Sequence, residues 1–313
     1  MMRILIELPT WLGDSVMTTP AIENLINYYS NSEIIVIGTQ LSIEVFKNHP
    51  KISEVKVFDK KYRHFFKNLN ELGVFDVFFT FRGTFRSSLI KIFISSKKKY
   101  QYRASRYQNR HQVEKYNDFI NESLNINFPP LKLNIFRSNE GVKKNKALAG
   151  INPGAKYGSA KRWLPEKFAQ VAFELSKEYD IVIFGGVNET DIAFEIENLL
   201  LARGVLNYDN LSGKTSIEEL TNKISTLDLF ITGDSGPMHI AAVLQIPTIS
   251  IFGPTNCSAT SQWMNDQSVI VSKNLDCQPC MQRECPLNHH DCMQLIEAEE
   301  VLDAVNSLQL NNY

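Results

Sequence analysis

The sequence predicts an α/β protein built from two doubly wound domains. Short runs rich in Ile, Val and Phe alternate with amphipathic stretches along almost all of the 313 residues. Runs that are apolar on both faces are typical of strands buried in a parallel sheet, and the stretches between them have helical periodicity. The chain is also long enough for two cores, because a single core stops growing at about 250–300 residues.

Strands and helices are expected to alternate in chain order, which is the signature of a doubly wound fold. The expected strands cover residues 4–8, 34–38, 55–58, 74–81, 148–152, 181–185, 229–232 and 248–252. The expected helices cover residues 20–29, 165–179, 189–202, 216–225 and 296–308. A polar stretch within 134–147 separates the halves, so we expect domains over 1–140 and 141–295 and a C-terminal segment over 296–313.

The two halves carry opposite charge. Residues 1–140 hold 20 Lys and Arg against 13 Asp and Glu, whereas residues 141–313 hold 13 against 21. A basic half in a nearly neutral protein suggests an anionic partner on that side. The sequence has neither an apolar run of about 18 residues nor the pattern of a secretory leader, so a cytoplasmic protein without a membrane span is expected.

The first candidate site follows the first strand, at LPTWLGDSVMTTP (8–20). A turn containing Gly13 leads into a helix that is expected to begin near Ser15. Open α/β sheets bind ligands at this position, although the spacing is not that of a dinucleotide-binding glycine fingerprint. Asp14 is either the N-cap of the helix or a general base, and position alone leaves both open.

A second strand-to-helix turn, NPGAKYGSAKRWLP (152–165), favours phosphate binding. Its glycines allow the backbone to approach a ligand closely, and Lys161 places positive charge beside it. Solvated surface lysines are the alternative interpretation.

A third turn, ITGDSGPMHIAA (231–242), offers the backbone N–H groups of Ser235 and Gly236 at a helix start as a diphosphate cradle. Asp234 is better placed for sugar hydroxyls than for phosphate. His239 is either a packed core residue or part of the site. The GxSxG pattern of a nucleophile elbow is absent.

Two further segments stand out by composition. Between Asp76 and Glu114 the chain has nine Lys and Arg and no acidic residue, which favours an anionic ligand, whereas no nucleic-acid-binding module is recognisable. Four cysteines at 277, 280, 285 and 292 contain one CxxC half-site for zinc, but the second half is irregular. We interpret the cysteine segment as structural, with zinc or free thiols both possible.

These motifs together resemble one family, the lipopolysaccharide heptosyltransferases of glycosyltransferase family 9, most closely the heptosyltransferase II type. The resemblance covers nearly the whole chain and is carried by WLGDSVM (11–17), PGA with AKRW (153–155 and 160–163), GDSGPMH (233–239), FGP (252–254) and the cysteine segment. It implies a GT-B fold, with two Rossmann-like domains facing across a cleft and the C-terminal helix crossing back to the first domain.

The resemblance also implies roles for individual residues. Asp14 would be the general base, Lys161 would stabilise the diphosphate, Glu189 would hold the ribose, and Asp234 would contact heptose hydroxyls. The implied donor set is Thr10, Gly13, Gly154, Lys161, Glu189, Asp234, Ser235, Gly236, Met238 and His239. The implied acceptor set is Trp11, Arg63, Arg82, Arg86, Arg103 and Arg106.

The implied reaction is inverting transfer of heptose from ADP-heptose to the inner core of lipopolysaccharide, without a metal ion or other cofactor. The acceptor would be an anionic Kdo–lipid A derivative at the cytoplasmic face of the inner membrane, and no nucleic acid is expected. A GT-B enzyme or sugar-nucleotide epimerase with another donor is one alternative. A non-enzymatic protein that binds an anionic ligand is another.

Overall fold

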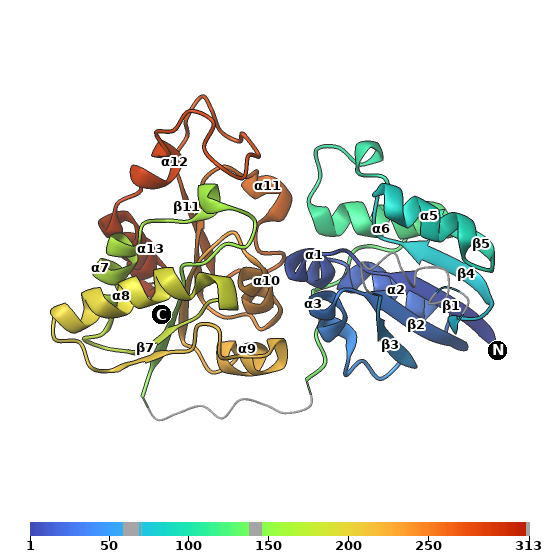
Figure 1. The fold of residues 1–313 in the computed structure, drawn as a ribbon, viewed down its shortest axis with the longest axis horizontal. Helices are drawn as coiled ribbons and strands as arrows, with labels where there is room; N and C mark the ends of the chain where they lie inside the picture. Colours follow the sequence, from blue (N-terminus) through green and yellow to red (C-terminus); the bar gives the residue numbers. More distant parts are fainter. Residues whose placement is uncertain (59–68, 70, 138–145, 311–313) are drawn as a thin grey trace. The chain divides into compact units, whose positions relative to one another are not determined.

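The computed structural model describes residues 1–58, 69, 71–137 and 146–310. The chain divides into two compact units, Met1–Ser138 and Asn139–Tyr313, and each is described by itself (Figure 1). Each unit holds one sheet in which every strand pairing is parallel. The predicted α/β fold class is therefore confirmed.

The first unit has the sheet order β3-β2-β1-β4-β5. Its strands are β1 (Met2–Glu7), β2 (Ser32–Gly38), β3 (Glu54–Val57), β4 (Phe75–Thr80) and β5 (Ser96–Gln101). Its helices are α1 (Leu12–Met17), α2 (Thr19–Tyr28), α3 (Gln40–Ile43), α5 (Phe85–Phe93) and α6 (Gln112–Leu124), with 3-10 turns η1 (Glu44–Phe46) and η3 (Ala104–Arg106).

The sheet of the first unit is covered on both faces. Ile90 and Ile94 of the α5 segment pack with Phe78 of β4 in one buried cluster. On the other face the ring of Phe79 contacts that of Phe119 in α6, and α2 packs beside α6. Burial on both faces explains why these strands read as continuous apolar runs.

The second unit has the sheet order β11-β10-β9-β6-β7-β8. Its strands are β6 (Leu148–Asn152), β7 (Asp180–Ile183), β8 (Tyr208–Asn210), β9 (Leu229–Gly233), β10 (Thr248–Phe252) and β11 (Ser268–Ser272). Its helices are α7 (Pro165–Leu175), α8 (Thr190–Ala202), α9 (Ile217–Ile224), α10 (Gly236–Val243), α11 (Cys257–Thr260), α12 (Asp291–Gln294) and α13 (Ala298–Leu310), with η4 (Ser159–Lys161) and η5 (Val187–Glu189).

Each sheet has one place where the chain order reverses direction. In the first unit β1 lies between β2 and β4, and in the second β6 lies between β7 and β9. Loops that leave neighbouring strands in opposite directions open a crevice at such a switch point, and ligands of open α/β sheets bind there. Ligand sites are therefore expected at the carboxyl ends of β1 and β4 in the first unit, and of β6 and β9 in the second.

The C-terminal helix completes the core of the second unit. Helix α13 packs on α7, β10 and β11 of its own unit, and Val301, Val305 and Leu308 are buried in the core of that unit. These side chains lie on one side of the helix at spacings of four and three residues, so they complete an apolar face that the sheet leaves open. The expectation that this helix also reaches the first domain stays a prediction. None of the described helices is long and apolar enough to cross a membrane.

Candidate functional site

In the second unit, the loops after β6 and β9 are joined at the switch point. The Asn152 side chain donates to Ser235 Oγ at 3.2 Å and to Thr232 Oγ1 at 3.4 Å. Asn152 is buried at the end of β6, where an amide needs hydrogen-bond partners. The predicted turns at 152–165 and 231–242 are thus held together, and the structure brings Gly154, Lys161 and Asp234 to one edge of the sheet.

Lys161 and Asp234 form an ion pair in this edge. Lys161 Nζ lies 2.5 Å from Asp234 Oδ2, and the two side chains are only 12% and 7% exposed. Thr255 donates to the same carboxylate oxygen at 2.6 Å, and Lys161 Nζ lies 4.7 Å from the ring centroid of Tyr157. Because both charges are largely removed from water, each depends on the other for compensation. The surface-lysine alternative is therefore wrong for Lys161.

The start of α10 provides the backbone part of the site. The helix begins at Gly236 with Ser235 as N-cap, and no side chain caps it. The first N–H groups of a helix attract anions through their hydrogen-bonding capacity and the helix dipole. Met238 is fully buried and His239 is 3% exposed, which supports the core interpretation of His239. The place of these two side chains in the donor set stays a prediction.

Glu189 lies directly against Gly154. A Cβ atom on Gly154 would stand 2.3 Å from Glu189 Cδ, so only glycine fits here while the carboxylate keeps its position. Glu189 Oε2 also accepts a hydrogen bond from the backbone N–H of Gly186 at 2.7 Å. The structure therefore presents a fixed carboxylate beside the loop that carries Lys161.

The cysteine segment supports the Lys161 loop. Tyr157 Oη donates to the Met281 carbonyl at 2.7 Å, the Ala160 N–H donates to the Arg283 carbonyl at 3.0 Å, and His290 Nε2 lies 2.9 Å from the Ala160 carbonyl. These contacts agree with the structural interpretation of the segment.

All five cysteines are free thiols, and burial raises the pKa of Cys292 to about 11. Across the described ranges, the structure gathers no set of three or more His, Cys, Asp or Glu side chains that could bind a metal ion. Among the described residues, the cysteine segment therefore does not form a set of ligands for zinc.

In the first unit, Asp14 stands in the first turn of α1 rather than at its cap. The N-cap position belongs to Trp11, because α1 begins at Leu12 and not near Ser15. The N-cap interpretation of Asp14 is therefore wrong. Tyr116 of α6 donates to Asp14 Oδ1 at 3.4 Å. Burial, with the nearby Asp14 charge, holds the pKa of Tyr116 well above 10, so this hydroxyl keeps its proton.

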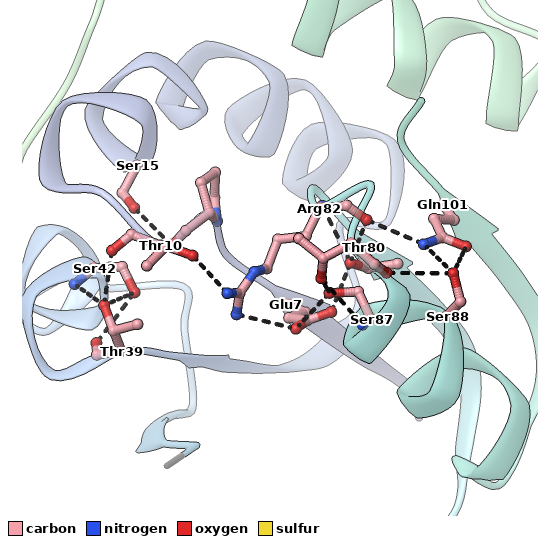
Figure 2. A network of polar contacts seen from close by, with 12 residues as sticks. Glu7, Thr10, Ser15, Thr39, Ser42, Thr80, Arg82, Ser87, Ser88 and Gln101 are labelled. Atoms are coloured by element: carbon pink, nitrogen blue, oxygen red, sulfur yellow. Dashed lines mark hydrogen bonds and ion pairs between the residues drawn. The ribbon is translucent and has the colours of Figure 1, made fainter. Parts of the chain in front are cut away.

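A buried carboxylate, Glu7, organises the carboxyl ends of β1 and β4 (Figure 2). It accepts hydrogen bonds from Thr80 at 2.6 Å and Ser87 at 3.1 Å. Arg82 Nη1 lies 3.3 Å from Glu7 Oε1, and the same guanidinium donates through Nη2 to Thr10 Oγ1. The Thr10 carbonyl accepts from Thr39 at 3.0 Å. Burial raises the pKa of Glu7, while these donors and Arg82 oppose that shift.

The predicted acceptor residues fall into different environments. Trp11 is 37% exposed, and Arg103 and Arg106 are exposed on the loop after β5. Arg82 is 12% exposed and bonded to Glu7, while Arg86 lies over the Phe58 ring. Arg63 lies outside the described residues. The exposed side chains of Arg103 and Arg106 can therefore reach an acceptor directly, whereas Arg82 is largely buried and bonded to Glu7.

The basic tract is partly neutralised by carboxylates from elsewhere in the fold. Lys97 pairs with Asp76, and Arg106 lies 3.9 Å from Glu122. Arg110 pairs with both Glu114 and Asp118. The sequence shows no counter-charge inside the tract because these partners precede or follow it.

Sequence reasoning missed Glu7, Tyr116 and Thr255 as site residues. Glu7 had a signal, since an acidic residue directly follows three apolar residues (4–6) of an expected buried strand, and a charge there needs partners. Tyr116 and Thr255 had none, because only the fold brings them to Asp14 and Asp234.

Two doubly wound units, each with polar side chains at its switch point, have the architecture of glycosyltransferases of the GT-B fold. The solved structures agree on the fold. Escherichia coli ADP-heptose LPS heptosyltransferase II matches with a TM-score of 0.81 at 22% identity, over 99% of each chain. E. coli heptosyltransferase WaaC with ADP matches with a TM-score of 0.76 at 15% identity, over 98% of this chain and all of that one.

The chain belongs to glycosyltransferase family 9 (heptosyltransferase), whose sequence pattern matches residues 62–290. It is 39% identical, over the full length of both chains, to lipooligosaccharide heptosyltransferase 2 of Campylobacter jejuni. The family resemblance of the sequence motifs is thereby confirmed, and the protein is an enzyme of the glycosyltransferase class.

Proposed function

We propose that this enzyme transfers heptose from ADP-L-glycero-D-manno-heptose to the first heptose of the lipopolysaccharide or lipooligosaccharide inner core. The observation that carries the proposal is the Lys161–Asp234 pair beside the uncapped start of α10. This arrangement suits a sugar diphosphate, because it offers a cation and backbone N–H groups to phosphate and a carboxylate to sugar hydroxyls. The identity of the sugar comes from the full-length likeness to heptosyltransferases named type 2.

The donor roles follow from the second unit. Lys161 and the Ser235 and Gly236 amides stabilise the diphosphate, and Asp234 accepts hydrogen bonds from heptose hydroxyls. Glu189, fixed against Gly154, accepts from the ribose hydroxyls. Because Asp234 already holds Lys161, the cation is oriented before the donor arrives.

The chemical step takes place at one acceptor hydroxyl. Asp14 takes the hydroxyl proton while the acceptor oxygen forms a bond to the anomeric carbon of heptose. The bond from that carbon to the ADP oxygen breaks on the opposite face, so the configuration inverts and ADP leaves with the bonding electrons. Lys161 and the helix amides stabilise the growing charge on ADP. No metal ion is required in this scheme.

The acceptor proposal concerns the first unit. Arg103 and Arg106 are exposed cations that suit the carboxylates and phosphates of a Kdo–lipid A acceptor, and Trp11 offers an exposed ring to a sugar face. Such an acceptor places the enzyme at the cytoplasmic face of the inner membrane.

A donor–acceptor assay tests the function. The purified protein is incubated with ADP-heptose and a Kdo–lipid A acceptor that carries one heptose, and ADP release and acceptor mass are followed. We expect release only with this acceptor, a mass gain of one heptose, and unchanged turnover with a chelator. Controls use the acceptor without heptose and a UDP-sugar. Turnover with the UDP-sugar, or epimerisation of it without an acceptor, would replace the proposal by the alternative donor class.

A further inference from the structure

Helix α5 carries large apolar side chains that are more than half exposed. It turns Ser87 and Ile90 into the unit, while Phe85 is 79% and Ile92 is 65% exposed. These two lie seven residues apart, about two helical turns, and so share one side of the helix. Phe93, next to them, is 51% exposed. Large exposed apolar side chains gathered on one side of a helix are typical of a surface that a membrane or another molecule covers.

The strand beside this helix is basic. Strand β5 carries Lys97, Lys98 and Lys99, and lies beside the C-terminal end of α5 (Figure 1). Lys99 Nζ donates to the Ile92 carbonyl at 3.0 Å, which fixes the strand against the helix. Neither α5 nor β5 contains an acidic residue.

The positive charge of this surface is only partly neutralised. Asp76 pairs with Lys97 at 2.7 Å, which leaves that lysine 77% exposed. Within the part of the chain that the structure describes, no carboxylate pairs with Lys91 of α5 or with Lys99 of β5. An apolar stripe therefore lies next to lysines that retain their charge.

We propose that the α5–β5 face, defined as Phe85, Ile92, Phe93, Lys91 and Lys97, docks on the surface of an anionic lipid bilayer. The apolar side chains enter the interface between headgroups and acyl chains, and the lysines contact lipid phosphates. A second copy of this chain is disfavoured as the partner. Symmetric pairing of this face with itself would bring the lysines of the two copies close together. The choice of a membrane as the partner rests on the proposed function in one respect only, namely that the proposed acceptor is linked to a lipid.

Vesicle sedimentation tests this docking without donor or acceptor. The full-length protein is mixed with vesicles of phosphatidylcholine containing a minor fraction of phosphatidylglycerol, or with pure phosphatidylcholine, over a series of salt concentrations. The charge variant is Lys91→Gln with Lys97→Gln, and the apolar variant is Phe85→Ser with Ile92→Ser. The matched control is Leu206→Ser with Lys177→Gln, which changes exposed residues of the second unit.

We expect wild type and control to sediment with the anionic vesicles, less at high salt, and neither to sediment with pure phosphatidylcholine. The charge variant should lose about 25-fold in partitioning, on the basis of roughly fivefold for each of two lysines, and the apolar variant at least about tenfold. Unchanged sedimentation of either variant, or equal binding of wild type to neutral vesicles, overturns the proposal.

Transferase activity separates this proposal from the proposed function. With a deacylated, water-soluble acceptor all variants should turn over like wild type, because none of the changed residues belongs to the donor or acceptor sets. A wild-type protein that sediments with anionic vesicles but transfers no heptose refutes the function and supports the docking surface. Wild-type transfer combined with unchanged sedimentation of the variants refutes only the docking surface.

Discussion

Arg82 bridges Glu7 and Thr10, with one guanidinium nitrogen 3.3 Å from the Glu7 carboxylate and another bonded to the Thr10 hydroxyl. Glu7 closes β1, and Thr10 stands in the turn that leads to Asp14 (Figure 2). The bridge therefore ties the strand end to the turn that presents the proposed base. A rigid turn matters here because a base has to be held within hydrogen-bond reach of the proton that it removes.

The pH dependence of stability should report on Glu7. Burial raises its folded-state pKa above 4.5, so the folded protein binds this proton more tightly than the unfolded chain. The resulting stabilisation is present below about pH 4.5 and is lost as pH rises through the folded pKa. Glu7→Gln removes this component and weakens hydrogen bonds worth about 2 kcal/mol. We expect a variant that is less stable at acid pH but loses less stability than wild type as pH rises.

Urea unfolding at several pH values measures both effects. Glu54→Gln changes an exposed carboxylate, and its free energy of unfolding should change with pH as that of wild type does. If the free energy of unfolding of Glu7→Gln changed with pH as that of wild type does, burial would not raise the pKa of Glu7.

Lys161→Met should separate catalysis from stability. Loss of the cation should reduce kcat/KM about 10²- to 10³-fold, since it removes charge stabilisation at the leaving group. It should also lower Tm, because Asp234 is left buried without its partner. Adding Asp234→Asn should restore Tm but not activity. Lys156→Met, an exposed lysine of the same loop, is the control, and recovery of activity in the double variant would contradict the assigned role.

Gly154→Ala should impair nucleotide binding with little effect on stability. The new Cβ atom collides with the Glu189 carboxyl group, so this side chain has to leave the position in which the Gly186 N–H holds it, while the backbone can stay in place. We expect the Kd for ADP, measured by calorimetry, to rise about tenfold, as for loss of about 1.4 kcal/mol. Gly83→Ala, where a Cβ meets only ordinary contacts, should bind ADP like wild type. Equal ADP binding by Gly154→Ala would remove Glu189 from the nucleotide site.

Tyr116→Phe tests the hydroxyl that reaches Asp14. Losing one hydrogen bond to a charged group should lower kcat about tenfold, with an unchanged KM for the donor. Tyr107→Phe is the matched control, because its hydroxyl bonds to Glu122 instead. A drop in kcat of the same size in both variants would indicate a general effect on packing.

Much of the fold could be predicted because buried parallel strands require apolar runs. The predicted strand at 148–152 coincides with β6. Strand β5 was missed, since SKKKYQ has one strand neighbour and lies at a sheet edge where polar side chains reach water. The last helix was predicted correctly as a helix, but its packing partner depends on which apolar face the sheet leaves open.

The loops of the candidate site could also be predicted, whereas their internal contacts could not. Strand ends followed by glycine and a helix start are visible in sequence, which located Asp14 and Lys161. The start of α1 was misplaced by a few residues, and this error alone made Asp14 look like a cap. The pairing of Arg82 with Glu7 spans 75 residues, and no local pattern encodes such a contact.

The most direct test of the account is the turnover of Asp14→Asn with ADP-heptose and the heptosylated acceptor. The substitution keeps the shape of the side chain but removes its ability to take a proton. We predict a kcat lowered about 10²- to 10⁴-fold with ADP affinity unchanged, while Asp303→Asn on the exposed side of α13 keeps wild-type turnover. An Asp14→Asn enzyme that transfers heptose at the wild-type rate would contradict the account.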